Sequence, residues 1–168
     1  MKMLNATIFT LMMFGNCTQQ GWNKYAENGY EISYPESWSK QQKGKAVFFL
    51  SPKENNNDQF QENVNLILQD LSQQPMNLEQ YTELTKKQVI DNFGASAIVS
   101  LKNTIIAGLQ GKEIVYNMNY QGRILKLKQY WFIKGNIAYL FSYTAEPSKY
   151  EKYESTVTEM IKSFSINK

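Results

Sequence analysis

Apolar and polar residues alternate along residues 98–145, and this pattern restricts the chain to folds that contain an antiparallel sheet. Ile114, Tyr116 and Met118 lie on one face of one predicted strand, and the last strand shows the same alternation. Glycine-containing turns at 108, 121–122 and 135–136 separate the strands, and a pair such as Gly135-Asn136 is typical of a two-residue hairpin turn. The segment therefore predicts a four-stranded antiparallel meander.

Shorter patterns predict further strands at 30–34, 46–50 and 63–71, separated by a polar loop at 51–62. A helix is expected between Asn77, which with Gln80 has the spacing of a capping box, and Gly94, a natural stop. Its apolar residues follow a helical stripe, formed by Leu78, Tyr81, Leu84, Val89 and Phe93. A closing helix follows Pro147, where apolar residues recur at helical spacing from Tyr150 to Phe164. These elements predict the α+β class, with helices covering an antiparallel sheet.

The first residues have the layout of a secretory signal. Lys2 is followed by an apolar run that is shorter than the ~20 residues needed to cross a bilayer, and then by Gly15. The chain's single cysteine, Cys17, comes next, and it has no second cysteine with which to form an internal disulfide. The sequence 13–17 (MFGNC) resembles the lipobox of bacterial lipoproteins, in which the cysteine is acylated.

We therefore predict a signal peptide at 1–16, a lipidated tether at 17–28 and one domain at 29–168. This organisation places the protein outside the cytoplasm and anchored to a membrane, in the periplasm, at the cell surface or in the thylakoid lumen. Ordinary signal cleavage nearby, which leaves a free thiol on Cys17, and a short uncleaved anchor remain alternatives.

Composition argues against two functional classes. A formal net charge of +3 is too weak and scattered for nucleic-acid binding, which needs a concentrated basic face. With no histidine, the chain lacks the usual general base at neutral pH, and Ser-His-Asp and Cys-His arrangements are impossible. Ser37 and Lys40 match a serine–lysine spacing, but they follow a Tyr-Pro turn instead of opening a helix. We therefore predict that the chain has no catalytic residues and is not an enzyme, with a hydrolase as a remote alternative.

Three features are candidates for binding. Glu54, Asp58 and Glu62 lie in the polar loop at spacings that could supply oxygen ligands to Ca²⁺, the one cofactor considered, although solvated loop charges are the simpler explanation of these residues. Tyr130 and Phe132 fall on one face of a predicted strand and Trp131 on the other, so rings on an uncovered face would form a partner surface; core packing is the alternative. A pocket between sheet and helix, lined by Tyr and Asn, would favour a small-ligand carrier.

Several segments together resemble the PsbP-like family, and the likeness covers about residues 28–166. The segments are 30–38 (YEISYPESW), 63–66 (NVNL), 76–81 (MNLEQY), 129–132 (QYWF), 139–146 (YLFSYTAE) and 160–166 (MIKSFSI). The resemblance implies an α/β/α sandwich with a central antiparallel sheet, the fold of Mog-type Ran-binding proteins and of DcrB-like periplasmic lipoproteins.

The resemblance also implies a role. PsbP proteins are extrinsic photosystem II subunits that help retain calcium and chloride, and the cyanobacterial member is a lipoprotein of the thylakoid lumen. We therefore expect a membrane-tethered, non-enzymatic protein that binds a membrane-associated protein partner or supports assembly, and a photosystem II subunit if the host is photosynthetic. A periplasmic carrier of a small ligand or of calcium is the alternative. The absence of histidine rules out any histidine metal ligand, and no plant-type basic extension is present.

Overall fold

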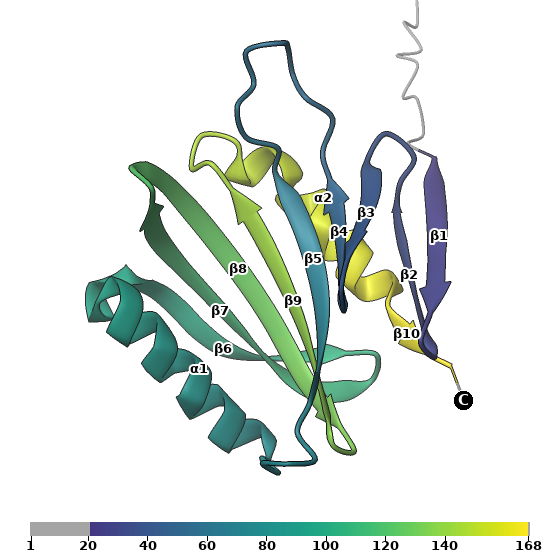
Figure 1. Ribbon diagram of the computed structural model, residues 1–168, viewed down its shortest axis with the longest axis vertical. Coiled ribbons are helices and arrows are strands. Elements are labelled where there is room, and N and C mark those ends of the chain that lie inside the picture. The colour runs from purple at the N-terminus through teal and green to yellow at the C-terminus, as the bar shows by residue number, and fades with distance from the viewer. Residues whose placement is uncertain (1–20, 168) are drawn as a thin grey trace, which may run out of the picture.

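The computed structural model describes residues 21–167. Two α-helices and a short 3-10 helix accompany the strands of two sheets in this part of the chain (Figure 1). In chain order the elements are β1 (Trp22–Glu27), β2 (Tyr30–Pro35), β3 (Ser39–Lys43), β4 (Ala46–Leu50), β5 (Asn63–Asp70), α1 (Leu78–Phe93), η1 (Ala95–Ala97), β6 (Ile98–Ile106), β7 (Leu109–Tyr120), β8 (Arg123–Lys134), β9 (Ile137–Ala145), α2 (Tyr150–Ser163) and β10 (Ser165–Ile166).

The main sheet has seven strands in the order β3-β4-β5-β9-β8-β7-β6, and every neighbouring pair is antiparallel. Strands β6 to β9 form the meander that the alternating pattern predicts, so this prediction is confirmed. The last of them, β9, pairs with β5, which brings the two halves of the chain together at the centre of the sheet.

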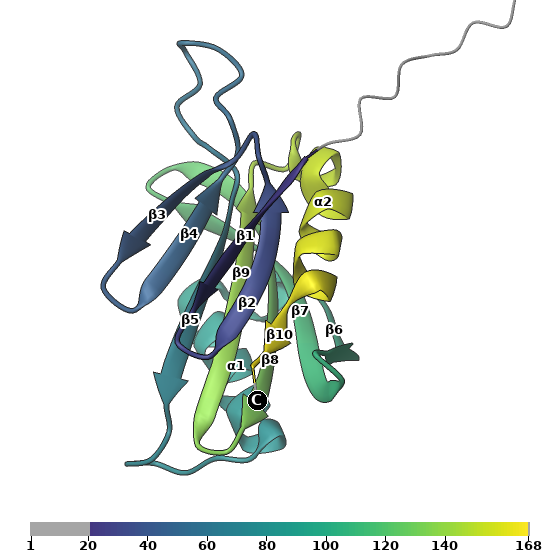
Figure 2. The same ribbon diagram turned by 90° about the vertical axis from the view of Figure 1, so that its right-hand side faces the viewer.

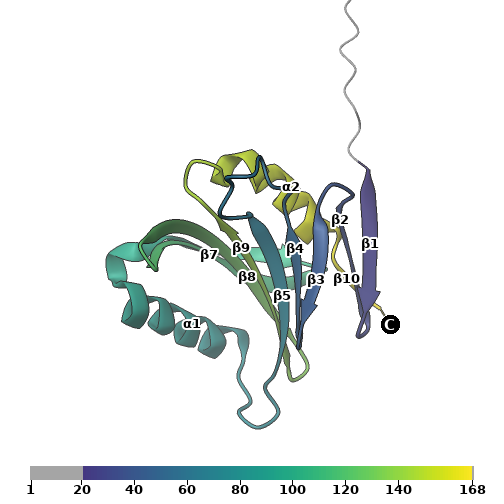
Figure 3. The same ribbon diagram turned by 45° about the horizontal axis from the view of Figure 1, so that its top comes forward.

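Both faces of the sheet are covered, so strand residues that alternate in direction are buried on either side. Helix α1 packs on one face, and α2 packs on the other together with the small sheet β1-β2-β10 (Figures 2 and 3). One core contains Phe132, Phe141 and Met160, and the other contains Trp131 and Ile114. The predicted α+β class and its α/β/α layers are confirmed.

Strand β1 occupies part of the predicted tether. Trp22–Glu27 pairs with β2 through a turn at Asn28 and Gly29, whose φ angles are 53° and 77°. Positive φ at both central residues is the type I′ hairpin geometry for which Asn-Gly is favoured. The backbone is fixed even earlier, because Glu36 N donates to Gly21 O at 2.9 Å. The folded domain therefore begins before the predicted boundary at residue 29.

Helix α1 has the predicted ends. Gln80 N donates to Asn77 Oδ1 at 2.9 Å, Asn77 N donates to Gln80 Oε1 at 3.0 Å, and Gly94 caps the last turn. Its buried face differs from the expected apolar stripe, because Thr82 and Thr85 are buried. Both threonine hydroxyls donate to helix carbonyls, at 2.7 and 2.9 Å, which satisfies them inside the core.

The predicted signal peptide (1–16) and Cys17 lie outside the described residues. Within residues 21–167, no helix combines the length and the hydropathy that a membrane span requires.

Candidate functional site

The predicted aromatic partner surface is not exposed. Tyr130 and Phe132 are buried under α2 and the small sheet, whereas Trp131 is buried under α1, where its Nε1 donates to Thr82 Oγ1 at 3.2 Å. The alternation of these side chains between the two faces is as expected, but layers cover both faces. The three rings therefore belong to the two cores and do not form an exposed surface that a partner could contact.

The three loop carboxylates proposed as calcium ligands meet around a lysine. Lys149 Nζ, just before α2, lies 3.2 Å from Asp58 Oδ1, 3.5 Å from Glu54 Oε2 and 3.8 Å from Glu62 Oε2. Among residues 21–167, no group of three or more acidic or cysteine side chains has the geometry to hold a metal ion. The lysine ammonium already supplies the positive charge between these oxygens, so calcium binding here stays a prediction to which the geometry lends no support.

Glu62 is the most enclosed member of this cluster. Its side chain is fully buried, and its Oε1 accepts a 3.4 Å hydrogen bond from Glu146 N, whereas its Oε2 has no hydrogen-bond donor in the described part of the chain. Burial raises the pKa of this carboxyl above that of an ordinary glutamate, although the charge of Lys149 acts in the opposite direction. Ser51 Oγ, from the residue opposite Glu62 at the base of the loop, is also buried without a partner among the described residues.

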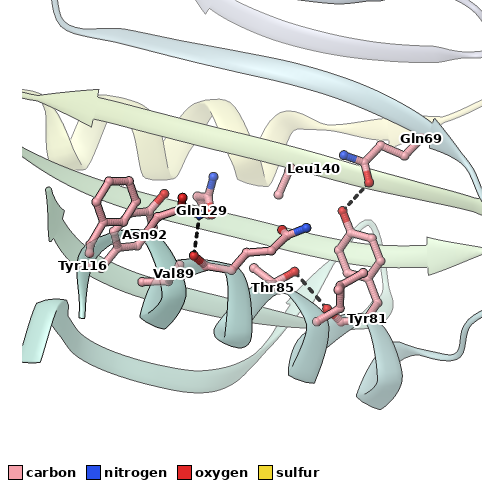
Figure 4. A pocket seen from close by; sticks show the side chains of 11 residues that line it. Gln69, Tyr81, Thr85, Val89, Asn92, Tyr116, Gln129 and Leu140 are labelled. Atoms are coloured by element: carbon pink, nitrogen blue, oxygen red, sulfur yellow. Dashed lines mark hydrogen bonds between the residues drawn. The ribbon is translucent and has the colours of Figure 1, made fainter. Parts of the chain in front are cut away.

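A cleft of about 250 Å³ lies between α1 and the sheet (Figure 4). Its floor comes from four neighbouring strands, through Gln69 of β5, Leu140 of β9, Gln129 of β8 and Tyr116 of β7. Its other wall is the face of α1. The cleft therefore depends on the β5-β9-β8-β7 order, which brings together residues far apart in the sequence.

The wall formed by α1 explains why the predicted apolar stripe was incomplete. The helix residues that line the cleft follow one another at steps of one or three, which places them on one face. They are Tyr81, Leu84, Thr85, Gln88, Val89, Asn92 and Phe93. Gln88 and Asn92 sit where a core-facing helix would carry apolar residues. This polar substitution within the stripe is the sequence signal that could have located the cleft.

The sheet wall has a matching polar row. Gln129 lies between Leu127 and Trp131, both buried under α1, and its Nε2 donates to Ser142 Oγ at 2.9 Å on the neighbouring strand. Gln69 Oε1 accepts a 2.7 Å hydrogen bond from the Tyr81 hydroxyl across the cleft. These contacts hold the side-chain amides of the sheet in place at the bottom of the cleft.

The electrostatics of the cleft favour binding over proton transfer. Burial raises the pKa of Tyr81 to about 12 and that of Tyr116 to about 12. Both phenols therefore remain protonated at neutral pH, and the other polar groups of the lining are amides and a threonine hydroxyl. The lining holds no group that exchanges a proton near neutrality, as a general acid or base would need to do.

The sequence matches the family model described as PsbP over residues 20–166. The chain belongs to the PsbP family. No curated protein matches it.

Solved structures confirm the PsbP-like fold at low sequence identity. Cyanobacterial PsbP (CyanoP) from Synechocystis sp. PCC 6803 aligns with a TM-score of 0.63 and 15% identity, over 93% of this chain and 98% of that one. PA94 from Pseudomonas aeruginosa, a protein of unknown function, aligns with a TM-score of 0.61 and 14% identity, over 84% and 94%. The Saccharomyces cerevisiae Ran-binding protein Mog1p aligns with a TM-score of 0.55 and 7% identity, over 88% and 96%.

Proposed function

We propose that this PsbP-family chain is a non-enzymatic binding protein, held on the non-cytoplasmic side of a membrane through an acylated Cys17. The observation that carries the binding role is the cleft under α1, whose polar lining consists of neutral hydrogen-bonding groups. Such a lining can hold and orient a ligand, but it lacks the titratable groups with which enzymes move protons.

One form of this role is a carrier of a small ligand. The cleft is lined by Tyr81, Tyr116 and Asn92, the residue types that favour a carrier over a purely structural domain. A native mass spectrum of the protein purified from its own membranes would test it. A small molecule that is retained by the protein and released on unfolding supports a carrier, and a spectrum of the bare chain alone argues against one.

In the second form of this role, the chain binds a protein partner or supports the assembly of a complex. The yeast protein Mog1p, which shares this fold, is named for binding Ran. In this chain β6 is an edge strand of the main sheet, and its Val99 and Ile105 side chains are 57% and 65% exposed. An edge strand presents unpaired backbone groups, and exposed apolar side chains beside them suit the addition of a partner strand. In a photosynthetic host, the cyanobacterial relative makes photosystem II the first partner to test.

A pull-down from membranes with the native, processed protein tests the partner. Reproducible capture of one membrane-associated protein, weakened by Ile105→Lys on the edge strand, supports this role. If the variant captures the same protein as strongly as the parent does, the edge of β6 is not the contact surface. Turnover of a substrate by the purified protein would overturn the non-enzymatic assignment as a whole.

A further inference from the structure

The lining of the α1 cleft carries no charged side chain, and all of its residues lie in the described part of the chain. A charged ligand that enters such a site loses hydration and gains no opposite charge, which makes its transfer from water costly. A neutral ligand avoids this cost. The cleft therefore discriminates by charge before any hydrogen bond is considered.

The amides on the sheet side each use one end within the protein. Gln69 Oε1 accepts from the Tyr81 hydroxyl, so its NH₂ group remains available as a donor. Gln129 Nε2 donates to Ser142 Oγ, so its Oε1 remains available as an acceptor. The floor thus offers a donor from β5 and an acceptor from β8, both held in position by their internal hydrogen bonds.

The helix side repeats this arrangement. Asn92 Nδ2 donates to the backbone oxygen of Gln88 at 2.7 Å, which leaves Asn92 Oδ1 as an acceptor. Gln88 contributes a whole side-chain amide, and Tyr116 contributes a hydroxyl that can both donate and accept. The cleft therefore offers both hydrogen-bond donors and acceptors to a ligand. A hydroxyl group combines both functions in one atom, so it is the ligand group that matches this lining.

Aromatic rings stand at the two ends of the cleft. Tyr81 lies at one end, and Tyr116 lies at the other, where its ring stacks on Phe93 with centroids 5.9 Å apart and an interplanar angle of 21° (Figure 4). Phe93 covers one face of the Tyr116 ring, and the ring surface that Tyr81 and Tyr116 leave open to the cleft is apolar and can pack against the C–H groups of a saturated ring. A ligand with hydroxyls on its edge and C–H groups on its faces fits both kinds of wall.

The size of the cleft sets a limit on the ligand. A volume of about 250 Å³ is just below the usual range for drug-sized ligands and equals the space of roughly eight waters at ~30 Å³ each. One six-membered sugar ring can occupy such a space, whereas a longer oligosaccharide would extend out of its open side.

We propose that the cleft between α1 and the sheet binds a neutral, polyhydroxylated molecule of single-sugar-ring size. This inference rests on the proposed binding role and specifies its ligand class. The same chemistry could reach the cleft as a free monosaccharide or as the terminal sugar of a membrane glycolipid, and the test separates these two sources.

The test is a titration of the ¹⁵N-labelled full chain in detergent, followed by NMR. The free probes are glucose, galactose and mannose, each compared with glucuronate and glucosamine as charged rings of the same size and with cyclohexanol as an apolar ring. Phosphatidylcholine vesicles with and without a glucosyl diacylglycerol, mixed with protein from which the detergent has been removed, provide the membrane-bound sugar. We expect saturable shifts of α1 and β8 amides with a neutral sugar, and at least about tenfold weaker binding of the charged rings.

Substitutions connect binding to the cleft. Gln88→Leu and Asn92→Leu change exposed positions of α1, and Tyr116→Phe removes only a hydroxyl. Each should weaken sugar binding by about tenfold, because each removes a hydrogen-bonding group. Gln110→Leu makes the same change as Gln88→Leu at an exposed position of β7 outside the cleft, and it should leave binding unchanged.

Each outcome decides the proposal. Saturation by free sugars supports a soluble ligand, and saturation only by the glycolipid vesicles supports a membrane-bound one. Saturation of the same amides only by a charged ring or by cyclohexanol overturns the ligand class and leaves the proposed binding role standing. If no probe produces saturable shifts, the ligand class is overturned, and the membrane pull-down and the native mass spectrum then decide the binding role separately.

Discussion

At the scale of single residues, Glu62 couples the stability of the fold to pH. Because burial raises its pKa, the unfolded chain loses this proton at a lower pH than the folded chain does. Stability contributed by the protonated carboxyl is therefore present below the ordinary glutamate pKa of about 4.3, falls as pH rises from there to the folded-state pKa, and stays lower above it.

The substitution Glu62→Gln removes this titration while keeping the shape of the side chain. We expect the variant to melt at a higher temperature than the parent at about pH 7, with the difference fading towards pH 4, where both side chains are neutral. Thermal unfolding followed by circular dichroism at several pH values measures this. The opposite result, a lower melting temperature at pH 7, would mean that the attraction of Lys149 for the Glu62 carboxylate outweighs the cost of burying it.

Two tryptophans of contrasting burial test the assignment of Trp131 to the core. Trp131 is fully buried, whereas Trp22 is 39% exposed at the start of β1. We expect Trp131→Ala to lower the free energy of unfolding by about 3–5 kcal/mol, since it opens a cavity and leaves the Thr82 hydroxyl without its indole partner. The matched change Trp22→Ala should cost about 1 kcal/mol or less. Urea unfolding provides both values, and equal costs would contradict the burial of Trp131.

At the scale of elements, Lys149 connects the 51–62 loop to the start of α2. Its ion pairs reach Glu54, Asp58 and Glu62, and Lys152 adds a second contact to Glu54 at 2.5 Å. We expect Lys149→Gln to speed amide hydrogen exchange within the loop, because three carboxylates then repel one another without a central cation. Hydrogen exchange read by mass spectrometry measures the change. Lys162→Gln, which breaks an exposed pair with Glu159, is the control and should leave the loop unchanged.

The contrast between α1 and its cleft shows which features of this chain are predictable from sequence. The capping box at Asn77 and Gln80 is a local arrangement, so residues three apart reveal it. The type I′ turn at Asn28-Gly29 is also local, and its residue types would have extended the predicted domain to include β1. The cleft is not local, because Gln69 and Gln129 come together only through the pairing of β5 with β9 and of β9 with β8.

At the scale of the whole molecule, the fold determines how closely an anchor would hold the domain to a membrane. Strand β1 begins at Trp22, and the backbone is already bonded at Gly21, so the chain between Cys17 and the domain reaches less than about 20 Å. The start of β1 lies at the same end of the molecule as the 51–62 loop (Figure 1). An acylated Cys17 would therefore hold this end, with the cluster around Lys149, near the lipid headgroups.

The substitution Cys17→Ser should change where the protein is located without changing the stability of its fold. We expect the variant to move from the membrane fraction to the soluble fraction, because a stable anchor depends on the acyl chains, each buried CH₂ contributing about 0.8 kcal/mol. Its melting temperature should match that of the parent, since the domain buries its cores from β1 onward. Mass spectrometry of the mature N-terminus shows directly whether Cys17 is acylated and where the chain is cleaved. An unmodified thiol on Cys17, or cleavage at another bond, would contradict lipidation while leaving the PsbP-family fold and the α1 cleft as they are.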